Sequence, residues 1–271
     1  MEQKTEKLKV DYHFHPNLPK SDICAERKIT EIYKKFEQLN IRVVLITEHI
    51  YKNYTRAWQL MKKYRPDNMI IFPGIEYVTK ENIDICLFSE TEQIYQYDLR
   101  PFQLSYKEVI SFLKSHADIF GYVTHPFTLG QTSIMDKKGR EFTKAAINEI
   151  GAVEARYTVF HQLRTFIQKT NFLSKHFTKL LDQINKNEQI PLSFYPSNIK
   201  FLAAGSDAHH TWEIGTCAEI IIENDDIFYS IINNKDLHAI EYRSSSILQT
   251  IISLLTTLHE WWLKRWFKIW N

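Results

Sequence analysis

Apolar runs of five to eight residues alternate along the chain with segments that have helical spacing. The runs rich in β-branched and aromatic residues predict strands at 8–13, 41–47, 69–76, 84–88, 119–124, 150–155, 201–205, 218–222 and 238–242. Amphipathic segments between many of them predict helices at 25–39, 53–64, 105–117, 141–149, 160–187 and 225–233. Repeated alternation of strand and helix predicts an α/β fold with a parallel sheet, closed or doubly wound.

Two stretches depart from this alternation. Residues 128–143 are polar and predict a long loop over one end of the sheet. Residues 244–271 hold four of the six tryptophans and predict an amphipathic helix, so we expect one domain at 1–243 and a separate helix at 244–271. Charged residues in this helix argue against a membrane span. We expect its apolar face to pack against the barrel, a second subunit or a partner protein, in preference to a membrane surface.

Composition narrows the class of protein. A length of 271 residues fits one large α/β domain, and a hydrophobic fraction of 44% is ample for a core. A net charge of +2 gives no strong field that would indicate nucleic acid or an anionic membrane. The three cysteines have no CxxC spacing, and the charged start MEQKTEKLK lacks the apolar stretch of a secretion signal, so we expect a cytoplasmic protein.

Histidines and carboxylates follow the ends of five predicted strands. In VDYHFHP, His13 and His15 share one face of the first strand, because successive strand side chains alternate. The other four clusters are TEH at 47–49, PGIE at 73–76, THP at 124–126 and GSDAHH at 205–210. The C-terminal ends of parallel barrel strands converge on one rim. The clusters therefore predict one metal site.

The ordered set HxH, TEH, PGIE, THP and GSDAHH resembles the PHP (polymerase and histidinol phosphatase) superfamily of metal-dependent phosphoesterases, over about residues 10–240. This resemblance implies a distorted (β/α)7 barrel, to which the C-terminal amphipathic helix is an addition. It also implies two or three divalent metal ions (zinc, manganese or iron). The implied reaction is hydrolysis of phosphate esters by a metal-activated water in a multinuclear site.

The same resemblance implies roles for individual residues. The implied metal ligands are His13, His15, His49, Glu76, His125, Asp207 and His209. Glu76 would bridge two ions, while His49 and His209 would serve a third ion or contact the substrate phosphate as catalytic residues. From its place at a predicted strand end, Arg156 is a further candidate catalytic residue, because a guanidinium group binds phosphate oxygens bidentately.

Three positions depart from the usual motifs of the superfamily. Glu48 stands where many members have aspartate, a mild departure because some histidinol-phosphate phosphatase relatives share TEH. The other two are candidate metal ligands. Asp22 is the residue nearest to a further ligand that many members carry after HxH, and it is equally a candidate N-cap for the helix at 25–39. Cys86 stands where relatives usually have a ligand histidine. A thiolate can bind zinc, but a free cysteine is also a common core residue.

The first functional interpretation is a hydrolase of small phosphomonoesters, nucleotides or oligonucleotide ends. Two alternatives stay open: a histidinol-phosphate phosphatase, and a metal-binding PHP module without catalysis. The expected partners are a phosphorylated small molecule or nucleotide as substrate, and a second copy or another protein at the C-terminal helix.

Overall fold

The computed structural model describes residues 6–127, 133–156, 195–235, 238–241 and 246–270, so the helix predicted at 160–187 lies outside the described residues. Each of the nine predicted strands is present within two residues of its predicted ends. The strands are β1 (Lys7–Phe14), β2 (Val43–Ile46), β3 (Ile70–Val78), β4 (Asp84–Ser89), β5 (Ile119–Val123), β6 (Ala152–Arg156), β7 (Phe201–Ala204), β8 (Thr216–Ile221) and β9 (His238–Glu241). The main helices are α1 (Asp22–Gln38), α2 (Tyr54–Lys63), α3 (Tyr106–Ser115), α4 (Ile134–Ile150), α8 (Ile227–Asn233) and α9 (Ile247–Trp270).

The strands form one mixed sheet in the order β7-β6-β5-β4-β3-β2-β1-β8-β9. Neighbours from β1 to β3 and from β5 to β7 are parallel, whereas β4 runs antiparallel to both β3 and β5. The expectation of a parallel sheet is therefore wrong at β4, and also at β8, which runs antiparallel to both β1 and β9. At β4 the short connection after β3 explains the difference. A connection of five residues (79–83) suits a hairpin but is too short for a parallel crossover.

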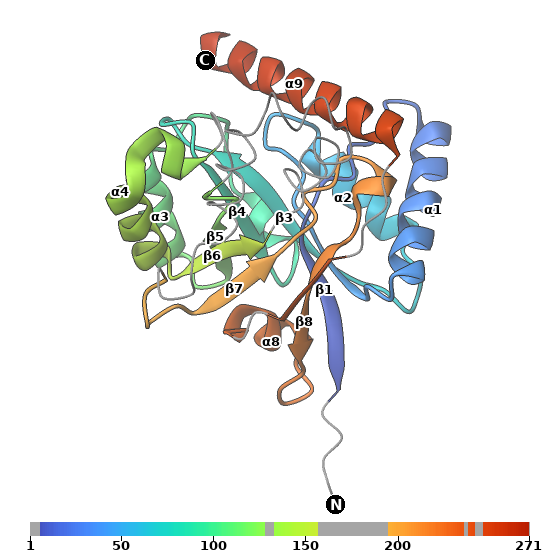
Figure 1. Ribbon diagram of the computed structural model, residues 1–271, viewed down its shortest axis with the longest axis horizontal. Coiled ribbons are helices and arrows are strands. Elements are labelled where there is room, and N and C mark those ends of the chain that lie inside the picture. The colour runs from blue at the N-terminus through green and yellow to red at the C-terminus, as the bar shows by residue number, and fades with distance from the viewer. Residues whose placement is uncertain (1–5, 128–132, 157–194, 236–237, 242–245, 271) are drawn as a thin grey trace, which may run out of the picture.

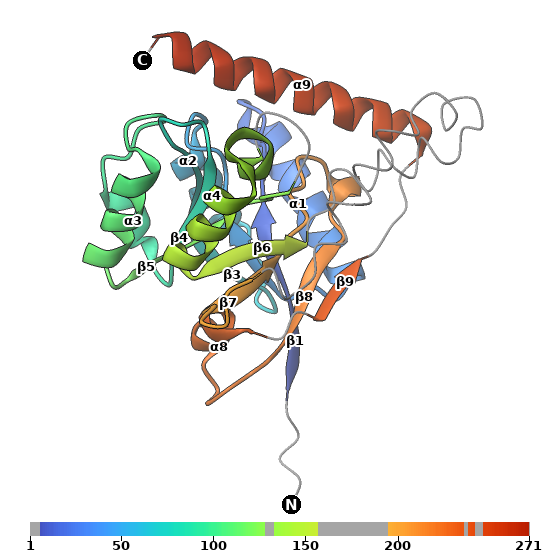
Figure 2. The same ribbon diagram turned by 60° about the vertical axis from the view of Figure 1, so that its left-hand side comes forward.

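The chain segment after β7 returns to β1 and nearly closes the sheet into a barrel. The backbone N–H of Asp207 donates to the carbonyl oxygen of His13 (2.8 Å), and that of His15 donates to the carbonyl oxygen of Ala208 (3.1 Å). Gly205 permits this approach, because a Cβ there would lie 2.3 Å from the Cβ of His13. Figures 1 and 2 show α1 and α2 on one side of this barrel and α3 and α4 on the other.

The strands read as continuous apolar runs because both faces of the sheet are covered. In β2, Val43 and Leu45 belong to a core cluster that includes residues of β3 to β7. The alternate residues Val44 and Ile46 belong to a second cluster with apolar residues of α1 and α2. This packing places both ends of each strand in fixed positions, which the candidate site requires.

The polar stretch predicted as a loop at 128–143 is helical from Ile134 onward. Ser133 caps α4, since its hydroxyl oxygen accepts a hydrogen bond from the backbone N–H of Asp136 (3.2 Å). The side chain of Ile134 is buried in the core. Gly139 interrupts the helical backbone with φ of 79°. The loop prediction is wrong here because a capping residue and two separate helical turns hide the usual apolar periodicity.

Helix α9 lies across the barrel at the end opposite the N-terminus (Figures 1 and 2). Its polar residues Thr250, Glu260 and Lys264 are buried, whereas most of its large apolar residues are exposed. The expectation that its apolar face packs against its own barrel is therefore wrong. The physical reason is that ionised partners on the barrel hold the polar face. Among the described residues, no helix is both long and apolar enough to cross a membrane.

Candidate metal centre

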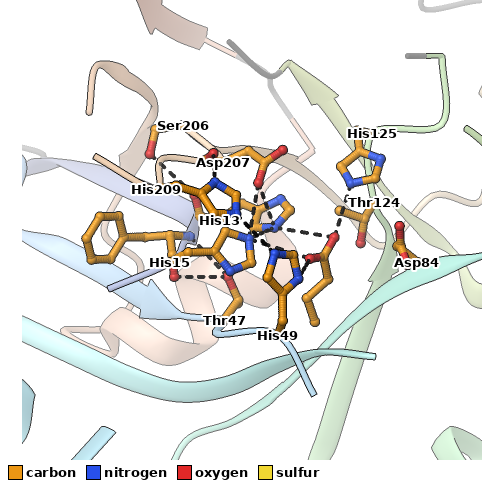
Figure 3. A network of polar contacts seen from close by, with 12 residues as sticks. His13, His15, Thr47, His49, Asp84, Thr124, His125, Ser206, Asp207 and His209 are labelled. Carbon is orange, nitrogen blue, oxygen red and sulfur yellow. Dashed lines mark hydrogen bonds and ion pairs between the residues drawn. The ribbon is translucent and has the colours of Figure 1, made fainter. Parts of the chain in front are cut away.

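His13 and His15 at the end of β1 are wholly buried, and their rings face each other. The two Nε2 atoms lie 2.9 Å apart, as Figure 3 shows. Two ring nitrogens at this separation can share at most one proton. Imidazole nitrogens that bind one zinc ion at about 2.0–2.1 Å also lie roughly 3 Å from each other. The pair is therefore arranged as two ligands of one ion.

Glu76 of β3 lies at the centre of the histidines. Its carboxylate oxygens are 2.5 Å from Nδ1 of His49, 3.1 Å from Nε2 of His125 and 3.5 Å from Nε2 of His15. Burial alone would raise the pKa of this carboxyl group. The charges and hydrogen bonds of His49 and His125 outweigh burial and hold the pKa of Glu76 well below its ordinary value. Glu76 is therefore a carboxylate in contact with several imidazoles.

The segment after β7 adds Asp207 and His209. A carboxylate oxygen of Asp207 lies 3.1 Å from Nε2 of His15, and Nε2 of His209 lies 3.0 Å from Nε2 of His49. Burial, reinforced by the charge of His15, lowers the pKa of both His49 and His209. A lowered pKa favours the neutral form of both rings, which is the form of histidine that binds metals.

Two residues of the site have left-handed backbone conformations that are uncommon for residues with a side chain. The φ angles are 26° at His125 and 48° at Asp207. The backbone N–H of His125 donates to a carboxylate oxygen of Glu154 (2.7 Å), and the backbone N–H of Asp207 donates to the carbonyl oxygen of His13 (2.8 Å). Strain of this kind is typical of functional sites.

Within the described residues, three groups of side chains have ligand atoms within 4.8 Å of one another. The groups are His15, His49 and His209; His13, His15 and Glu76; and Glu76, Asp84 and His125. His15 and Glu76 each belong to two groups, so the donor atoms form one continuous array. Imidazole nitrogens with carboxylate oxygens suit zinc, iron or manganese. The residues present thus fit more than one divalent ion.

Two members of the site were missed by sequence reasoning. Glu154 of β6 accepts hydrogen bonds from the Nδ1–H of His13 (3.1 Å) and from the backbone N–H of His125. An outer carboxylate of this kind orients a ligand imidazole. Asp84, at the start of β4, joins Glu76 and His125. The available signal was a single acidic residue in each of two mainly apolar strands, Glu154 within AVEAR and Asp84 at the start of DICLFS.

The structure leaves Asp22 outside this array. Its side chain is 82% exposed and pairs with Arg56 (2.7 Å) on the surface. Asp22 is also the first residue of α1, and Ser21 occupies the N-cap position. Both the ligand and the N-cap prediction for Asp22 are therefore wrong, because α1 begins three residues earlier than its apolar spacing indicates.

Cys86 and Arg156 lie close to the array without belonging to any of the three groups. Cys86 is buried opposite Glu76 in the β3–β4 register. Burial raises the pKa of its thiol, so it is protonated in this state. Arg156 ends β6 with an exposed side chain, and its carbonyl oxygen accepts a hydrogen bond from the backbone N–H of Gly205 (3.1 Å).

The polar face of α9 covers the site from outside. A carboxylate oxygen of Glu260 lies 2.6 Å from Nζ of Lys52, and the other lies 3.9 Å from Nε2 of His49. Farther along, Lys264 pairs with Asp84. Nε2 of His210 lies 2.8 Å from the hydroxyl oxygen of Thr256, which adds a contact on the His209 side. The C-terminal helix is thus part of the wall of the site.

Comparison with known proteins adds evidence on the fold. No protein-family model matches the sequence, and no curated protein matches it. The crystal structure of PsfC from Pseudomonas syringae PB-5123 aligns with a TM-score of 0.61 at 13% identity, over 93% of this chain and 98% of that chain. Endonuclease Q, solved with a 27-mer duplex substrate that has an abasic lesion at the active site, aligns with a TM-score of 0.51 at 12% identity.

The endonuclease Q alignment covers 83% of this chain and 55% of that one, so this chain spans about half the length of that protein. The lesion-specific endonuclease PfuEndoQ from Pyrococcus furiosus aligns with a TM-score of 0.48 at 15% identity, over 82% of this chain and 54% of its own. At these identities the likeness is one of fold. It shows that this chain shares its overall fold with these proteins.

Proposed function

We propose that this chain is a metal-dependent phosphoesterase, built on a distorted (β/α)7 barrel of the PHP type. The observation that carries the proposal is the continuous array of donor atoms in which His15 and Glu76 are each shared by two groups. Such sharing is typical of multinuclear sites that hydrolyse phosphate esters. The return of the chain from β7 to β1 supports the seven-stranded barrel.

In this proposal, residue roles follow the groups of donor atoms. His13, His15, Glu76 and Asp207 hold one ion, and Glu76 with Asp84 and His125 holds a second. His15, His49 and His209 hold a third ion or contact the phosphate. When bound, zinc, manganese or iron supplies positive charge for phosphate oxygens and lowers the pKa of a water nucleophile. Glu154 keeps His13 oriented, and Arg156 is a proposed phosphate-binding residue at the end of β6.

A small phosphomonoester, a nucleotide or an oligonucleotide end is the proposed substrate class. The endonuclease Q structure holds a duplex, but in this chain the buried site lies beneath α9. Glu260 and Lys264 reach the site from α9, so a bulky duplex cannot approach it while the helix stays in place. A single phosphate group needs far less room. The net charge of +2 also provides no extended basic surface for a duplex.

Metal content and hydrolysis, measured on the same samples, test this proposal. The full chain is loaded with zinc, manganese or iron, and turnover is followed on p-nitrophenyl phosphate, histidinol phosphate, mononucleotides and short oligonucleotides. Asp207→Ala is expected to lose bound metal and turnover together. Asp22→Ala is a matched control, because it removes a surface carboxylate that lies outside the array. Bound metal without turnover of any ester would favour a binding module, and absence of metal binding would refute the site.

A further inference from the structure

The outward face of α9 concentrates the exposed apolar surface of the described residues. Of the nine large hydrophobic residues that are exposed, six belong to this helix. They are Leu248 (67% exposed), Ile251 (42%), Leu255 (60%), Leu258 (61%), Trp262 (56%) and Trp266 (45%). Their spacing of three and four residues places them along one stripe of the helix. Contiguous apolar surface of this kind marks an interaction site.

The helix does not need this stripe to stay on the barrel. Its contacts with the barrel come from the opposite side, where Glu260 meets Lys52, Lys264 meets Asp84, and the hydroxyl of Ser253 accepts a hydrogen bond from the indole of Trp212 (3.1 Å). On the same side, the ring of Phe267 lies against that of Tyr51, with 5.9 Å between the ring centres. The helix therefore presents its apolar stripe to the surroundings while it remains fixed to the fold. Among the helices and strands of the described residues, Figures 1 and 2 show none on the outer side of α9.

The exposed charged residues of α9 are all basic. Arg265 is exposed beside the tryptophans, whereas Lys268 is exposed on the barrel side of the helix, with its Nζ atom 6.0 Å from the ring centre of Phe102. Glu260, the acidic residue of this helix, is buried against Lys52. An apolar stripe with tryptophans and an exposed arginine at its side is complementary to an anionic lipid surface, where apolar side chains enter the interface and the cation meets phosphate groups.

A second copy of the chain fits the stripe less well. Leu248 and Trp266 are separated by 18 residues, which is about 27 Å along a helix. A strip of this length and about 10 Å width, buried on both partners, amounts to roughly 540 Å², well below the roughly 1,000 Å² that a stable interface needs. A lipid surface has no such requirement, because affinity grows with each side chain that enters it.

We propose that α9 docks this protein on the surface of an anionic membrane, with the Leu248–Trp266 stripe entering the lipid interface and the helix lying parallel to it. This geometry turns the metal-site end of the barrel toward the membrane, since the polar side of the same helix covers that site. The membrane does not have to compete with the barrel for the helix, because the two use opposite faces.

Cosedimentation of the full chain with vesicles tests this proposal. Vesicles of phosphatidylcholine with about 30% phosphatidylserine are compared with pure phosphatidylcholine at low and high salt. The full chain is expected to bind the anionic vesicles, and added salt should weaken the binding. A triple variant, Leu255→Ser with Leu258→Ser and Trp262→Ser, should lower partitioning more than about tenfold. Ile23→Ser, which removes an 82% exposed isoleucine from α1, is the matched control and should bind like the parent.

Circular dichroism and bound metal check that the triple variant keeps its fold. Arg265→Glu is a second, milder test, and it should reduce binding to anionic vesicles only. The proposal is overturned if the full chain stays in the supernatant with anionic vesicles, or if the triple variant binds as well as the parent. A dimer mass by light scattering that the triple variant loses, with no vesicle binding, would assign the stripe to a second copy instead.

Discussion

Lys264 of α9 pairs with Asp84 of β4, with its Nζ atom 2.5 and 2.6 Å from the two carboxylate oxygens. Both side chains are almost completely buried. Asp84 is also a member of the donor group formed with Glu76 and His125. A single ion pair therefore links the C-terminal helix to the candidate metal centre, and the Lys264 ammonium occupies a carboxylate that a metal ion would use.

Lys264→Met should raise the affinity of the Glu76–Asp84–His125 group for a divalent ion, because the competing ammonium is gone. Without metal, the same change leaves Asp84 buried and unpaired, which should lower the free energy of unfolding by about 3–5 kcal/mol. Added zinc or manganese should restore much of this loss. Thermal unfolding with and without metal measures both effects. Lys268→Met, at an exposed position on the next turn, is the control and should change neither. If added metal raised the stability of both variants equally, Lys264 would not compete with metal for Asp84.

Glu154→Gln should lower metal affinity and turnover by about 10- to 100-fold. Glutamine keeps the size of the side chain but has one acceptor oxygen, so it cannot accept from both the His13 ring and the backbone N–H of His125. Metal titration followed by calorimetry measures the change, and circular dichroism verifies the fold. Glu149→Gln, on the exposed side of α4, is a matched control with no expected effect. Unaltered metal affinity in Glu154→Gln would show that His13 is oriented by other contacts.

Cys86→Ala should keep the number of bound metal ions, because the thiol belongs to none of the three donor groups. It should cost about 1 kcal/mol of stability, as expected for a small cavity in a fully buried position. Mass spectrometry measures the number of bound metal ions, and chemical unfolding measures the free energy of unfolding. Loss of one metal equivalent would instead make the thiolate a ligand, as the motif comparison left open.

Acidification should weaken the contact between His210 and α9. Burial lowers the pKa of His210 to about 4, below the ordinary value of 6.5. A histidine whose folded pKa is depressed stabilises the fold fully above pH 6.5, and that contribution is lost as the pH falls toward 4.

His210→Asn keeps a polar side chain beside Thr256 but does not titrate in this window. The melting temperature of the parent should therefore fall more steeply than that of the variant between about pH 7 and pH 5. Other groups titrate in both proteins and cancel in the comparison. Parallel curves would show that His210 does not contribute to the pH dependence.

Most of the secondary structure could be predicted from periodicity alone. The nine strands appear within two residues of the predicted ends, because apolar runs buried on both faces leave a clear signal. The meeting of His13, His15, His49, Glu76, His125, Asp207 and His209 could also be predicted, since strand ends on one rim converge. The prediction of a loop at 128–143 was wrong from Ile134 onward, because the polar composition of α4 concealed two helical turns.

Tertiary structure alone decided which partners these elements meet. Glu154 and Asp84 reach the histidines because β6 and β4 lie beside the right strands, and no local pattern records that pairing. The sequence determined that α9 has one apolar and one polar face. It did not determine which face meets the barrel, because that choice depends on Lys52 and Asp84, which lie about 200 residues away in sequence and pair with Glu260 and Lys264.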